Sequence, residues 1–492
     1  MAKKVVVIGA GISGLTAGIY AARAGFDTTI LEQHTTFGGL STGWSRKGYF
    51  FEGGMHWLTG SSEKVKLNKI WKEVGALKEN NPIENRDPYY TLVGDDGRDL
   101  HLWRDVDRLK EELLNYAPED AKMIKRLCRD IKIYKHVHLP VNEVRGLKTK
   151  NHIKSGLGEF IKMAPAGLRY AALSKISYVD YVNKFKNENV RHILMCVIGY
   201  RYNALSFIYS MAAFASGDCG YPDGGSIRMA QNMVDEFYHQ GGRLEYHIQA
   251  QKVVVENGKA IGVQTKDQFI PADAVIISQD LRNAVDKLFD EKPTDRWIGK
   301  LKKRVVTEQN MFISLGVKAD LSRLPYSVIF PLDEPIEFAG VEYNELRINN
   351  YAKYKDHSPE GCTSLTCLLL GDTYSYWKEA KQDGTYADKK RELARKFVAK
   401  LSEFIPELKT GLEVIDVATP CTYERYCSSF EGSWMSVWDK KGKGYNYPQE
   451  CSIKGVYFCG QRIMMPGGLP IAAYTGRRAV QLLCKNWKEE FR

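Results

Sequence analysis

The sequence of 492 residues lacks a Cys-x-x-Cys pair, although it contains ten cysteines. Because paired spacings are absent, we expect neither a zinc site nor a disulfide framework, and reduced thiols fit best. Some cysteines, such as Cys367 and Cys459, stand within apolar runs where a small buried side chain suffices. The sequence also lacks low-complexity tracts and repeats of fixed period. Its organisation must therefore be inferred from its motifs.

We expect neither a secretory leader nor a membrane span at the start of the sequence. Lys3 and Lys4 precede an uncharged run over residues 5–22 that superficially resembles a leader. Four glycines interrupt this run, and Arg23 follows where a small-residue cleavage site would be expected. We therefore expect a cytoplasmic protein with an uncleaved N-terminus.

The composition is that of an ordinary globular protein, and the length is sufficient for two or three domains. There are 70 basic and 59 acidic residues, which gives a net charge of +11. This excess favours anionic surfaces, but the charges are spread too evenly to indicate a nucleic acid. The main concentration of basic residues lies between Arg145 and Lys175.

The most informative pattern lies at the N-terminus, where the apolar run 5–8 is followed by Gly9, Gly11 and Gly14. A second apolar run then ends at Glu32. Gly9 permits a tight turn, Gly11 lets the backbone approach a diphosphate, and Gly14 lets the helix pack closely on the strand. Glu32 stands where an acid binds the ribose. The pattern therefore predicts a dinucleotide site at a helix N-terminus.

Signals of the same fold occur in three separate blocks. The second block contains the strands 252–256 and 260–265, joined by a tight turn at Asn257-Gly258, and then the buried strand 274–278. The third block contains the strand 455–459, the turn 466–470 and a helix over about Ile471 to Asn486. We expect the strand 274–278 to return to the parallel sheet.

We assign residues 1–79, 216–289 and 436–492 to the dinucleotide-binding domain. The two insertions, residues 80–215 and 290–435, are assigned to a second domain. The first looks mostly helical, with a helix that opens at Pro118-Glu119-Asp120 and runs to about Lys135. The second mixes strands with a helix whose apolar residues form one core stripe. These elements are the strands 311–317 and 363–370 and the helix 388–404 with Leu393, Phe397, Leu401 and Phe404.

Together, these motifs resemble the flavoprotein oxidoreductases that include phytoene desaturases, carotenoid isomerase and retinol saturase, within the amine-oxidase-like class. The resemblance covers nearly the whole chain. The motifs are the N-terminal fingerprint with Glu32, Gly38-Gly39, Tyr221-Pro222-x-Gly224-Gly225, Ala418-Thr419-Pro420 with Thr422, Gly455 to Gly460, Pro466-Gly467-Gly468 and Thr475-Gly476-Arg477. The resemblance implies an α/β fold, with a Rossmann-type FAD-binding domain of the glutathione-reductase-2 or amine-oxidase kind and a discontinuous α+β substrate domain.

The resemblance further implies that FAD is the dinucleotide. Glu32 would bind its ribose, Gly38-Gly39 would lie near the diphosphate, and Val253 would border the adenine. The helix after the turn at Pro466 would direct its N-terminus at the flavin pyrimidine, where it stabilises negative charge by roughly 0.3 to 2 kcal/mol. The implied contact residues are Gly9, Gly11, Ile12, Ser13, Gly14, Glu32, Gln33, Gly38, Gly39, Leu40, Val253, Gly460, Gln461, Gly468 and Leu469.

Two positions depart from the pattern of the family. Many members place an acid directly after the glycine equivalent to Gly460, whereas this sequence has Gln461. Many also have three consecutive glycines after the proline, and here Leu469 fills the third position. The first departure puts a ribityl or phosphate contact in doubt. The second could change how closely the loop approaches the isoalloxazine ring.

The sequence shows one complete glycine fingerprint, so no built-in NADPH site is expected. Electrons must come from, or go to, a small acceptor, a quinone or a partner protein, unless the reaction is redox-neutral. Flavin hydride chemistry on an apolar substrate requires orientation, exclusion of water and stabilisation of a transient charge. The absence of a Ser-His-Asp pattern and of a metal-ligand pattern is consistent with such chemistry.

Three residues are candidates for a catalytic role. His56 could donate a proton or stabilise a charge near the flavin, although a packing histidine is the more ordinary interpretation. Arg462 could approach the flavin or a polar group of the substrate, and a surface salt bridge is the alternative. Tyr423 follows the turn at Thr419-Pro420 and could line the cavity, although simple packing is common for such aromatic residues.

The stretch from Gly146 to Lys175 mixes basic and apolar residues. One interpretation is an interfacial helix in peripheral contact with anionic lipid on the inner face of the membrane, where an apolar substrate would enter. The other is an ordinary amphipathic helix with a solvated basic face.

The leading hypothesis is an FAD-dependent oxidoreductase acting on carbon–carbon double bonds of an apolar polyene or isoprenoid-type lipid, by desaturation, saturation or isomerisation. An amine or heteroatom oxidase on the same fold is the first alternative. A flavin-bearing isoprenoid-binding protein is the second.

Overall fold

The computed structural model describes residues 2–79, 81–94, 97–149, 153, 157–441 and 444–492. A five-stranded parallel sheet in the order β11-β2-β1-β15-β23 holds the N-terminal fingerprint. Its strands are β1 (Lys4–Ile8), β2 (Asp27–Leu31), β11 (Arg243–Glu245), β15 (Ala274–Ile277) and β23 (Val456–Phe458). The strand predicted at 274–278 is confirmed in this sheet as β15, which pairs in parallel with β1. The strand predicted at 455–459 is confirmed as β23, which pairs in parallel with β15.

Alternating side chains of β1 enter two different hydrophobic cores. Val5 and Val7 pack with the helices on one face, and Val6 and Ile8 pack with the elements on the other. The first face carries α1 (Ile12–Arg23), α2 (Lys66–Glu73), α9 (Gly225–His239) and α16 (Gly468–Trp487). The second carries α10 (Leu281–Lys287), α11 (Arg296–Arg304) and the sheet of β12 (Ala250–Glu256), β13 (Lys259–Thr265) and β14 (Phe269–Pro271).

The predicted hairpin is confirmed, since β12 and β13 pair antiparallel with Glu256 opposite Lys259. Asn257 and Gly258 both have positive φ, 50° and 70°, as a tight two-residue turn requires. Helix α16 begins at Gly468, three residues before the predicted Ile471. Pro470 therefore lies in the first turn of the helix, where a missing amide hydrogen removes no helical bond.

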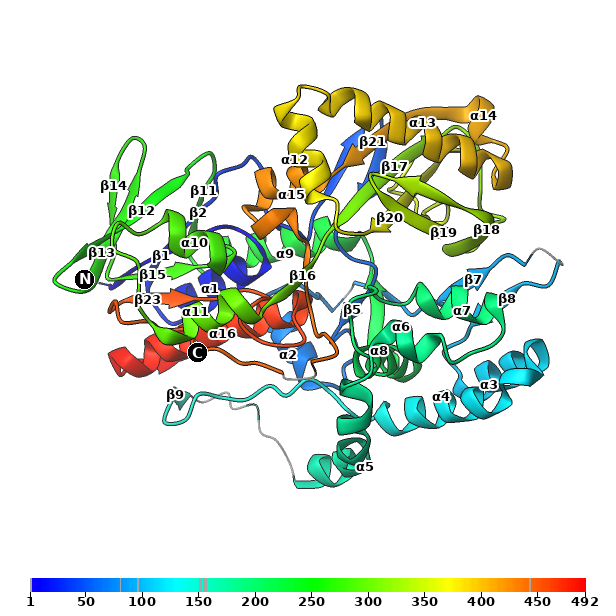
Figure 1. Ribbon diagram of the computed structural model, residues 1–492. Coiled ribbons are helices and arrows are strands. Elements are labelled where there is room, and N and C mark those ends of the chain that lie inside the picture. Colours follow the sequence, from blue (N-terminus) through cyan, green and yellow to red (C-terminus); the bar gives the residue numbers. More distant parts are fainter. Residues whose placement is uncertain (1, 80, 95–96, 150–152, 154–156, 442–443) are drawn as a thin grey trace.

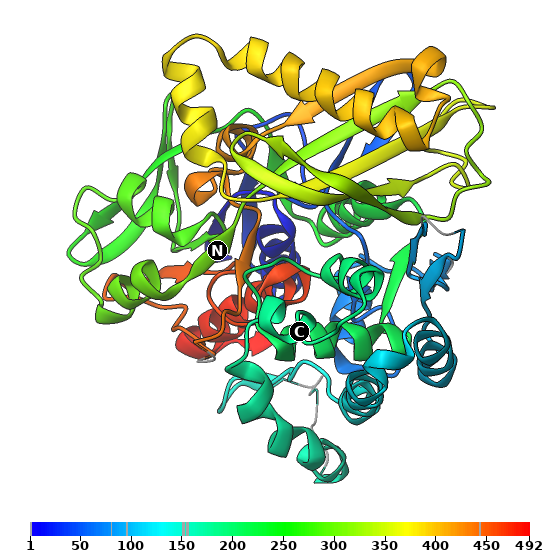
Figure 2. The same cartoon turned by 45° about the vertical axis from the view of Figure 1, so that its right-hand side comes forward.

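A second sheet of seven strands has the order β21-β17-β20-β19-β18-β7-β8. Its strands are β7 (Tyr90–Leu92), β8 (Leu100–Leu102), β17 (Asn310–Val317), β18 (Ser327–Phe338), β19 (Val341–Asn350), β20 (Thr363–Leu370) and β21 (Leu412–Ala418). Helices α12 (Tyr374–Gln382), α13 (Tyr386–Phe404) and α14 (Leu408–Gly411) lie along its outer side (Figures 1 and 2). The strands predicted at 311–317 and 363–370 are confirmed, as is the core stripe of α13 with Phe397 fully buried.

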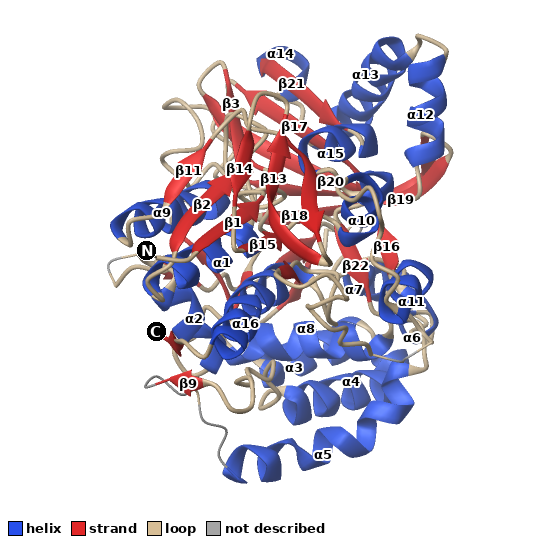
Figure 3. Cartoon of the chain, turned by 90° about the vertical axis from the view of Figure 1, so that its left-hand side faces the viewer, coloured by secondary structure: helices blue, strands red, loops and turns tan. Residues whose placement is uncertain are grey.

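Helices lie on the other side of this sheet. The mostly helical character predicted for the first insertion is confirmed. They are α3 (Val106–Tyr116), α4 (Ala121–Tyr134), α5 (Leu157–Ser174), α6 (Tyr178–Val182), α7 (Glu188–Met195) and α8 (Ala204–Ser216). Figure 3 shows the strands between this helical layer and α12–α14. The helix predicted from Pro118 is confirmed as α4, preceded by the short 3-10 turn η1 (Pro118–Asp120).

The basic stretch 146–175 is only partly helical. Lys148–Thr149 forms β9, which pairs with β24 (Glu490–Phe491), and α5 begins at Leu157. Lys150, His152 and Lys154 lie outside the described residues. Among the described residues, we find no helix long and apolar enough to cross a bilayer.

Short elements join the layers. They are β3 (Gly43–Arg46), β4 (Tyr49–Glu52), β5 (Leu58–Thr59), β6 (Ile83–Glu84), β10 (Cys219–Pro222), β16 (Val306–Glu308), α15 (Pro420–Cys427), η2 (Phe430–Gly432) and β22 (Met435–Val437). The ladder of β16 with β22 brings residues 306–308 beside residues 435–437. All ten cysteines lie in the described part of the chain, and each is unpaired.

Candidate active site

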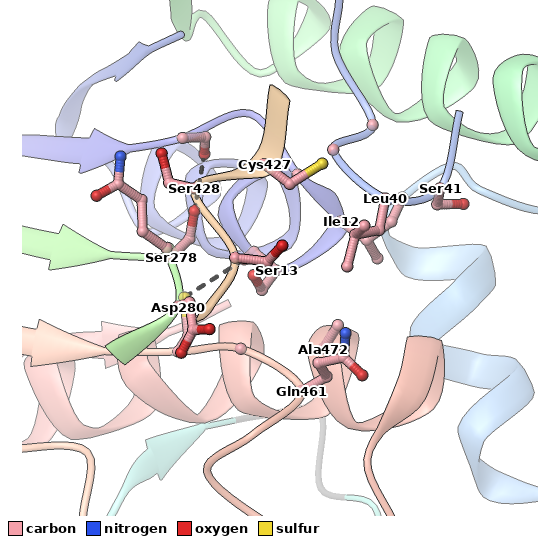
Figure 4. Close-up of a pocket in the computed structure, with 18 of the residues that line it drawn as sticks. Ile12, Ser13, Leu40, Ser41, Ser278, Asp280, Cys427, Ser428, Gln461 and Ala472 are labelled. Carbon is pink, nitrogen blue, oxygen red and sulfur yellow. Dashed lines mark hydrogen bonds between the residues drawn. The ribbon is translucent and has the colours of Figure 1, made fainter. Parts of the chain in front are cut away.

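A first cavity lies at the carboxyl ends of the parallel strands. It contains about 1280 Å³ of empty space, including its open mouth. Ile8, Leu31, Ser278 and Cys459 line it at or just after the ends of β1, β2, β15 and β23. Side chains from these separate segments surround one common space (Figure 4). Open α/β sheets bind their ligands at this edge.

Glycines form the wall of the first cavity beside α1. Gly9 has φ of +99°, and Gly11 is the N-cap of α1 and has no side-chain cap. Gly38 and Gly39, with φ of +95° and +62°, lie against Gly11. Ile12 and Ser13 also line the cavity, so the unsatisfied amides of the first turn face it. This arrangement suits an anionic group such as a diphosphate.

Glu32 lies at the end of β2 with only 8% of its surface exposed. The amide of Ala10 donates to its Oε2 (2.9 Å), and the amide of His34 donates to its Oε1 (3.0 Å). Each carboxylate oxygen has a second lone pair, so both can still accept from a hydroxyl group. Glu32, Gln33 and Leu40 all line the first cavity, as predicted.

Two expected contact residues lie away from the first cavity. A Cβ on Gly14 would lie 1.9 Å from the carbonyl oxygen of Gly9, so this glycine serves the packing of α1 against the turn. Val253 is 3% exposed and packs into the hydrophobic core that contains Val6 and Ile8. Ile248 and Ala250, which precede Val253, line the cavity in its place.

Gln461 links the C-terminal segments around the cavity. Its Nε2 donates to the carbonyl oxygen of Trp434 (2.8 Å), and the amide of Gly468 donates to its Oε1 (3.2 Å). Gly460, Gln461, Gly468 and Leu469 all line the first cavity. The N-terminus of α16 therefore lies at the first cavity.

Arg462 is not part of a surface salt bridge. It is 5% exposed and pairs with Asp280, which is also buried. Its Nη2 also donates to the carbonyl oxygen of Ser433 (2.8 Å). Asp280 caps α10 and accepts the amide of Phe430. Both residues line the first cavity, so the pair connects three segments of its wall.

Helix α15 reaches the first cavity only with its C-terminal end. Tyr426, Cys427, Ser428 and Ser429 line the wall near Glu32. Tyr423 lines neither of the two cavities. It lies three residues before Tyr426, which is about 4.5 Å earlier along the axis of α15.

A second cavity of about 1100 Å³ of empty space, also including open solvent, lies between the seven-stranded sheet and the helical layer. Its wall is largely apolar and includes Leu139, Val197, Ile198, Leu368 and Leu370. It meets the first cavity at a junction. The residues that line both cavities, here called the junction residues, are Gly54, Trp434, Met435, Gly468 and Leu469.

His56 lines the second cavity next to Gly54. Burial, reinforced by the charges of Arg347 and Arg86, lowers the pKa of His56 to about 3. The Nδ2 group of Asn349 lies 3.1 Å from His56 Nδ1. Because an amide nitrogen can only donate, Nδ1 accepts and the proton of the neutral ring is on Nε2. At neutral pH His56 is therefore a weak hydrogen-bond donor and carries no charge.

Sequence reasoning missed several residues of the site. Trp434 and Met435 at the junction, and Glu308 and Arg347 in the second cavity, carry no recognisable motif. Glu308 did leave one signal, because it is a charged residue between the apolar residues of Val305-Val306 and the strand that begins at Asn310.

Residues 12–484 match the family model described as flavin containing amine oxidoreductase. The chain belongs to this family. It is an FAD-dependent oxidoreductase, because the family contains a flavin and the fingerprint with Glu32 is that of a dinucleotide site.

Several curated proteins are similar to this chain over almost its whole length. The chain is 23% identical to phytoene desaturase (lycopene-forming) of Pseudescherichia vulneris, over 98% of this chain and 99% of that one. It is 25% identical to the chloroplastic prolycopene isomerase of Daucus carota, over 96% and 78%. It is 24% identical to all-trans-retinol 13,14-reductase of Danio rerio, over 94% and 83%. The structure of cyclohexylamine oxidase from Brevibacterium oxydans has the same fold, with a TM-score of 0.61 at 13% identity over 99% and 100% of the two chains.

The residues of the first cavity fit FAD. The main-chain amides at the start of α1, which no side chain caps, suit the diphosphate, and the carboxylate of Glu32 suits the ribose hydroxyls. The junction residues border both cavities, as the isoalloxazine ring requires if it is to meet a substrate. When bound, FAD supplies hydride transfer, and the chain supplies orientation and exclusion of water.

Gly11→Ala should separate cofactor binding from folding. A Cβ at Gly11 would meet no protein atom closer than 3.9 Å, and its φ of −71° suits any residue. The methyl group would instead occupy space next to the helix amides that face the diphosphate. We expect the thermal midpoint of the apoprotein to be unchanged and FAD affinity, measured by fluorescence titration, to fall about tenfold or more, which corresponds to about 1.4 kcal/mol.

Gly9→Ala is the control, because Gly9 has φ of +99° and a Cβ would lie 2.8 Å from Ser278 Oγ. This change should destabilise the apoprotein itself. Undiminished FAD affinity in Gly11→Ala would contradict the assignment of the glycine wall to the diphosphate.

His56→Asn should reduce the loss of stability in acid. The pKa of His56 is about 3 in the folded protein and about 6.5 when unfolded, so the unfolded state takes up a proton first as the pH falls. This difference costs the wild-type protein about 2 kcal/mol between about pH 7 and about pH 5. Thermal unfolding should show a smaller loss of stability between about pH 7 and about pH 5 for His56→Asn than for the wild type. Replacement of the exposed His239 by Gln should leave this loss at the wild-type value. An equal reduction of the loss in both variants would refute the neutral state of His56.

Proposed function

We propose that this flavoenzyme acts on carbon–carbon double bonds of an apolar polyene or isoprenoid-type lipid. The observation that carries the proposal is the second cavity, which has a largely apolar wall and shares the junction residues with the first cavity. An apolar chain in this cavity would exclude water from the reacting carbons. The relatives named above act on phytoene, prolycopene and all-trans-retinol, which supports this substrate class.

The wall of the second cavity is suited to orientation. Leu368 and Leu370 of β20 face it, whereas the alternate residues Cys367 and Leu369 are buried in the core of the sheet. His56 is neutral there, so it adds a hydrogen-bond donor without a charge that an apolar substrate would have to cover. Desaturation, saturation and isomerisation all need this same placement of a double bond beside the flavin.

The proposal predicts that the holoenzyme converts at least one polyene. FAD-loaded protein should be reduced by light without oxygen and mixed with candidate polyenes, and the oxidised form should be tested in parallel. Flavin reoxidation indicates saturation, and flavin reduction indicates desaturation. A change of substrate absorption without net flavin change indicates isomerisation. Failure of every polyene, together with amine-dependent peroxide release in air, would refute the proposal and favour an amine oxidase.

Leu368→Gln tests whether the polyene binds in the second cavity. It places a polar group in the second cavity and leaves the first cavity intact, so FAD content should be unchanged. We expect kcat/KM for the polyene to fall about tenfold or more, because one methylene group in an apolar pocket is worth about 1–3 kcal/mol.

We also propose peripheral membrane contact through α5. Leu168 is 87% exposed and Tyr170 is 40% exposed on this helix, which projects from the molecule in Figure 1. Co-sedimentation with anionic vesicles should decrease for Leu168→Asp and not for Phe269→Asp, because Phe269 is an exposed residue on the distant β14. Equal binding by both variants would contradict the contact.

A further inference from the structure

Glu308 is a buried carboxyl group where the two cavities meet. It is 3% exposed and lies at the end of β16, opposite Met435 of β22. Its carbonyl oxygen accepts the amide of Trp434 (3.0 Å). Trp434 and Met435 are junction residues, and Glu308 itself lines the second cavity. Glu308 therefore lies in the part of the second cavity that is nearest to the first cavity.

The carboxyl group of Glu308 is incompletely bonded. Its Oε2 is buried and has no hydrogen-bond partner among the described residues. It lies directly against the backbone of Gly199, where a Cβ would come within 1.8 Å of Oε2. Gly199 thus leaves room for the carboxyl group in the cavity wall. A buried carboxyl oxygen without a partner is costly in a structural role.

Burial holds the pKa of Glu308 near neutral pH. It raises the pKa to about 7, the charge of Arg201 and a hydrogen bond from the Arg201 backbone lower it in part, and the charge of Asp372 raises it further. The guanidinium of Arg201 is already paired with Asp372 (3.0 Å) and donates to the carbonyl oxygen of Thr307 (2.8 Å). On the cavity side Tyr202 donates to the carbonyl oxygen of Ser436 (2.9 Å). Both protonation states of Glu308 are accordingly accessible near neutral pH.

The other titratable side chains of the second cavity cannot exchange a proton there. The pKa of His56 is lowered to about 3, so its ring stays neutral. Burial raises the pKa values of Tyr202 and Tyr209 well above their ordinary range. Arg347 keeps its positive charge. Glu308 is thus the one described side chain on this wall that changes charge near neutral pH.

We propose that Glu308 is the proton-transferring catalytic residue of the reaction. In saturation, hydride from reduced FAD would form a C–H bond at one carbon of the double bond. Glu308 would give its carboxyl proton to the other carbon and be reprotonated from solvent. In desaturation, the Glu308 carboxylate would accept the proton from one carbon as hydride leaves the other for oxidised FAD. This inference rests on the proposed action on carbon–carbon double bonds.

Glu308→Gln in the FAD-loaded protein tests the inference, because it keeps the shape of the side chain and removes the proton. We expect FAD content to be unchanged and turnover to fall about 100-fold or more. The pH profile of the wild type should show a transition near pH 7 that is missing in the variant. Infrared difference spectra between about pH 6 and about pH 8 should show protonated carboxyl absorption in the wild type, to which Glu308 and Asp218 both contribute, and Glu308→Gln should remove the part that comes from Glu308.

Asp218→Asn is the matched control. The pKa of Asp218 is also raised to about 7 by burial, but its Oδ1 accepts the amides of Gly60 and Ser62 and it lines neither cavity. This variant should keep the wild-type pH profile. In the infrared spectra this variant should remove only the contribution of Asp218. Carboxyl absorption as strong in Glu308→Gln as in the wild type, or an unaltered pH profile in that variant, would overturn the inference. Absence of polyene turnover in the wild type would refute the proposed substrate class instead, and the infrared band would still decide whether Glu308 exchanges a proton.

Discussion

The site depends on main-chain amides that no side chain covers. The first turn of α1 starts at Gly11 without a side-chain cap, and Gly38 and Gly39 close over it from the next loop. Unsatisfied amides at a helix N-terminus require an acceptor, and an anionic ligand is the natural one. Glu32 is fixed beside this turn by the amides of Ala10 and His34. The position of the cofactor then sets the place of every other group.

The second requirement is that distant parts of the chain meet at the junction. The ladder of β16 and β22 places Glu308 beside Met435. The pair of Arg462 with Asp280 joins the C-terminal loop to the residues that follow β15. The two cavities therefore share walls that segments far apart in sequence build together. The proposed substrate in the second cavity and FAD in the first would both contact these walls.

Local patterns predicted the parallel sheet, the glycine turn, the 257–258 hairpin and the core stripe of α13, because each depends on neighbouring residues and strand or helix periodicity. The start of α16 was misplaced because Pro470 reads as a turn residue, although the first helical turn accepts it. Val253 followed from the resemblance and not from a local pattern, and its side chain packs in the core while Ile248 and Ala250 line the first cavity. Trp434 and Glu308 escaped notice because their positions depend on pairing between two three-residue strands, which have too little periodicity to be recognised.

The amide of Gln461 has a consequence for the departure from the family pattern. It donates to the carbonyl oxygen of Trp434 and accepts from the amide of Gly468. A carboxylate at this position could accept from Gly468 but would repel the carbonyl oxygen of Trp434. The glutamine thereby ties the loop that carries Trp434 to the first residue of α16, which an acid at this position could not do.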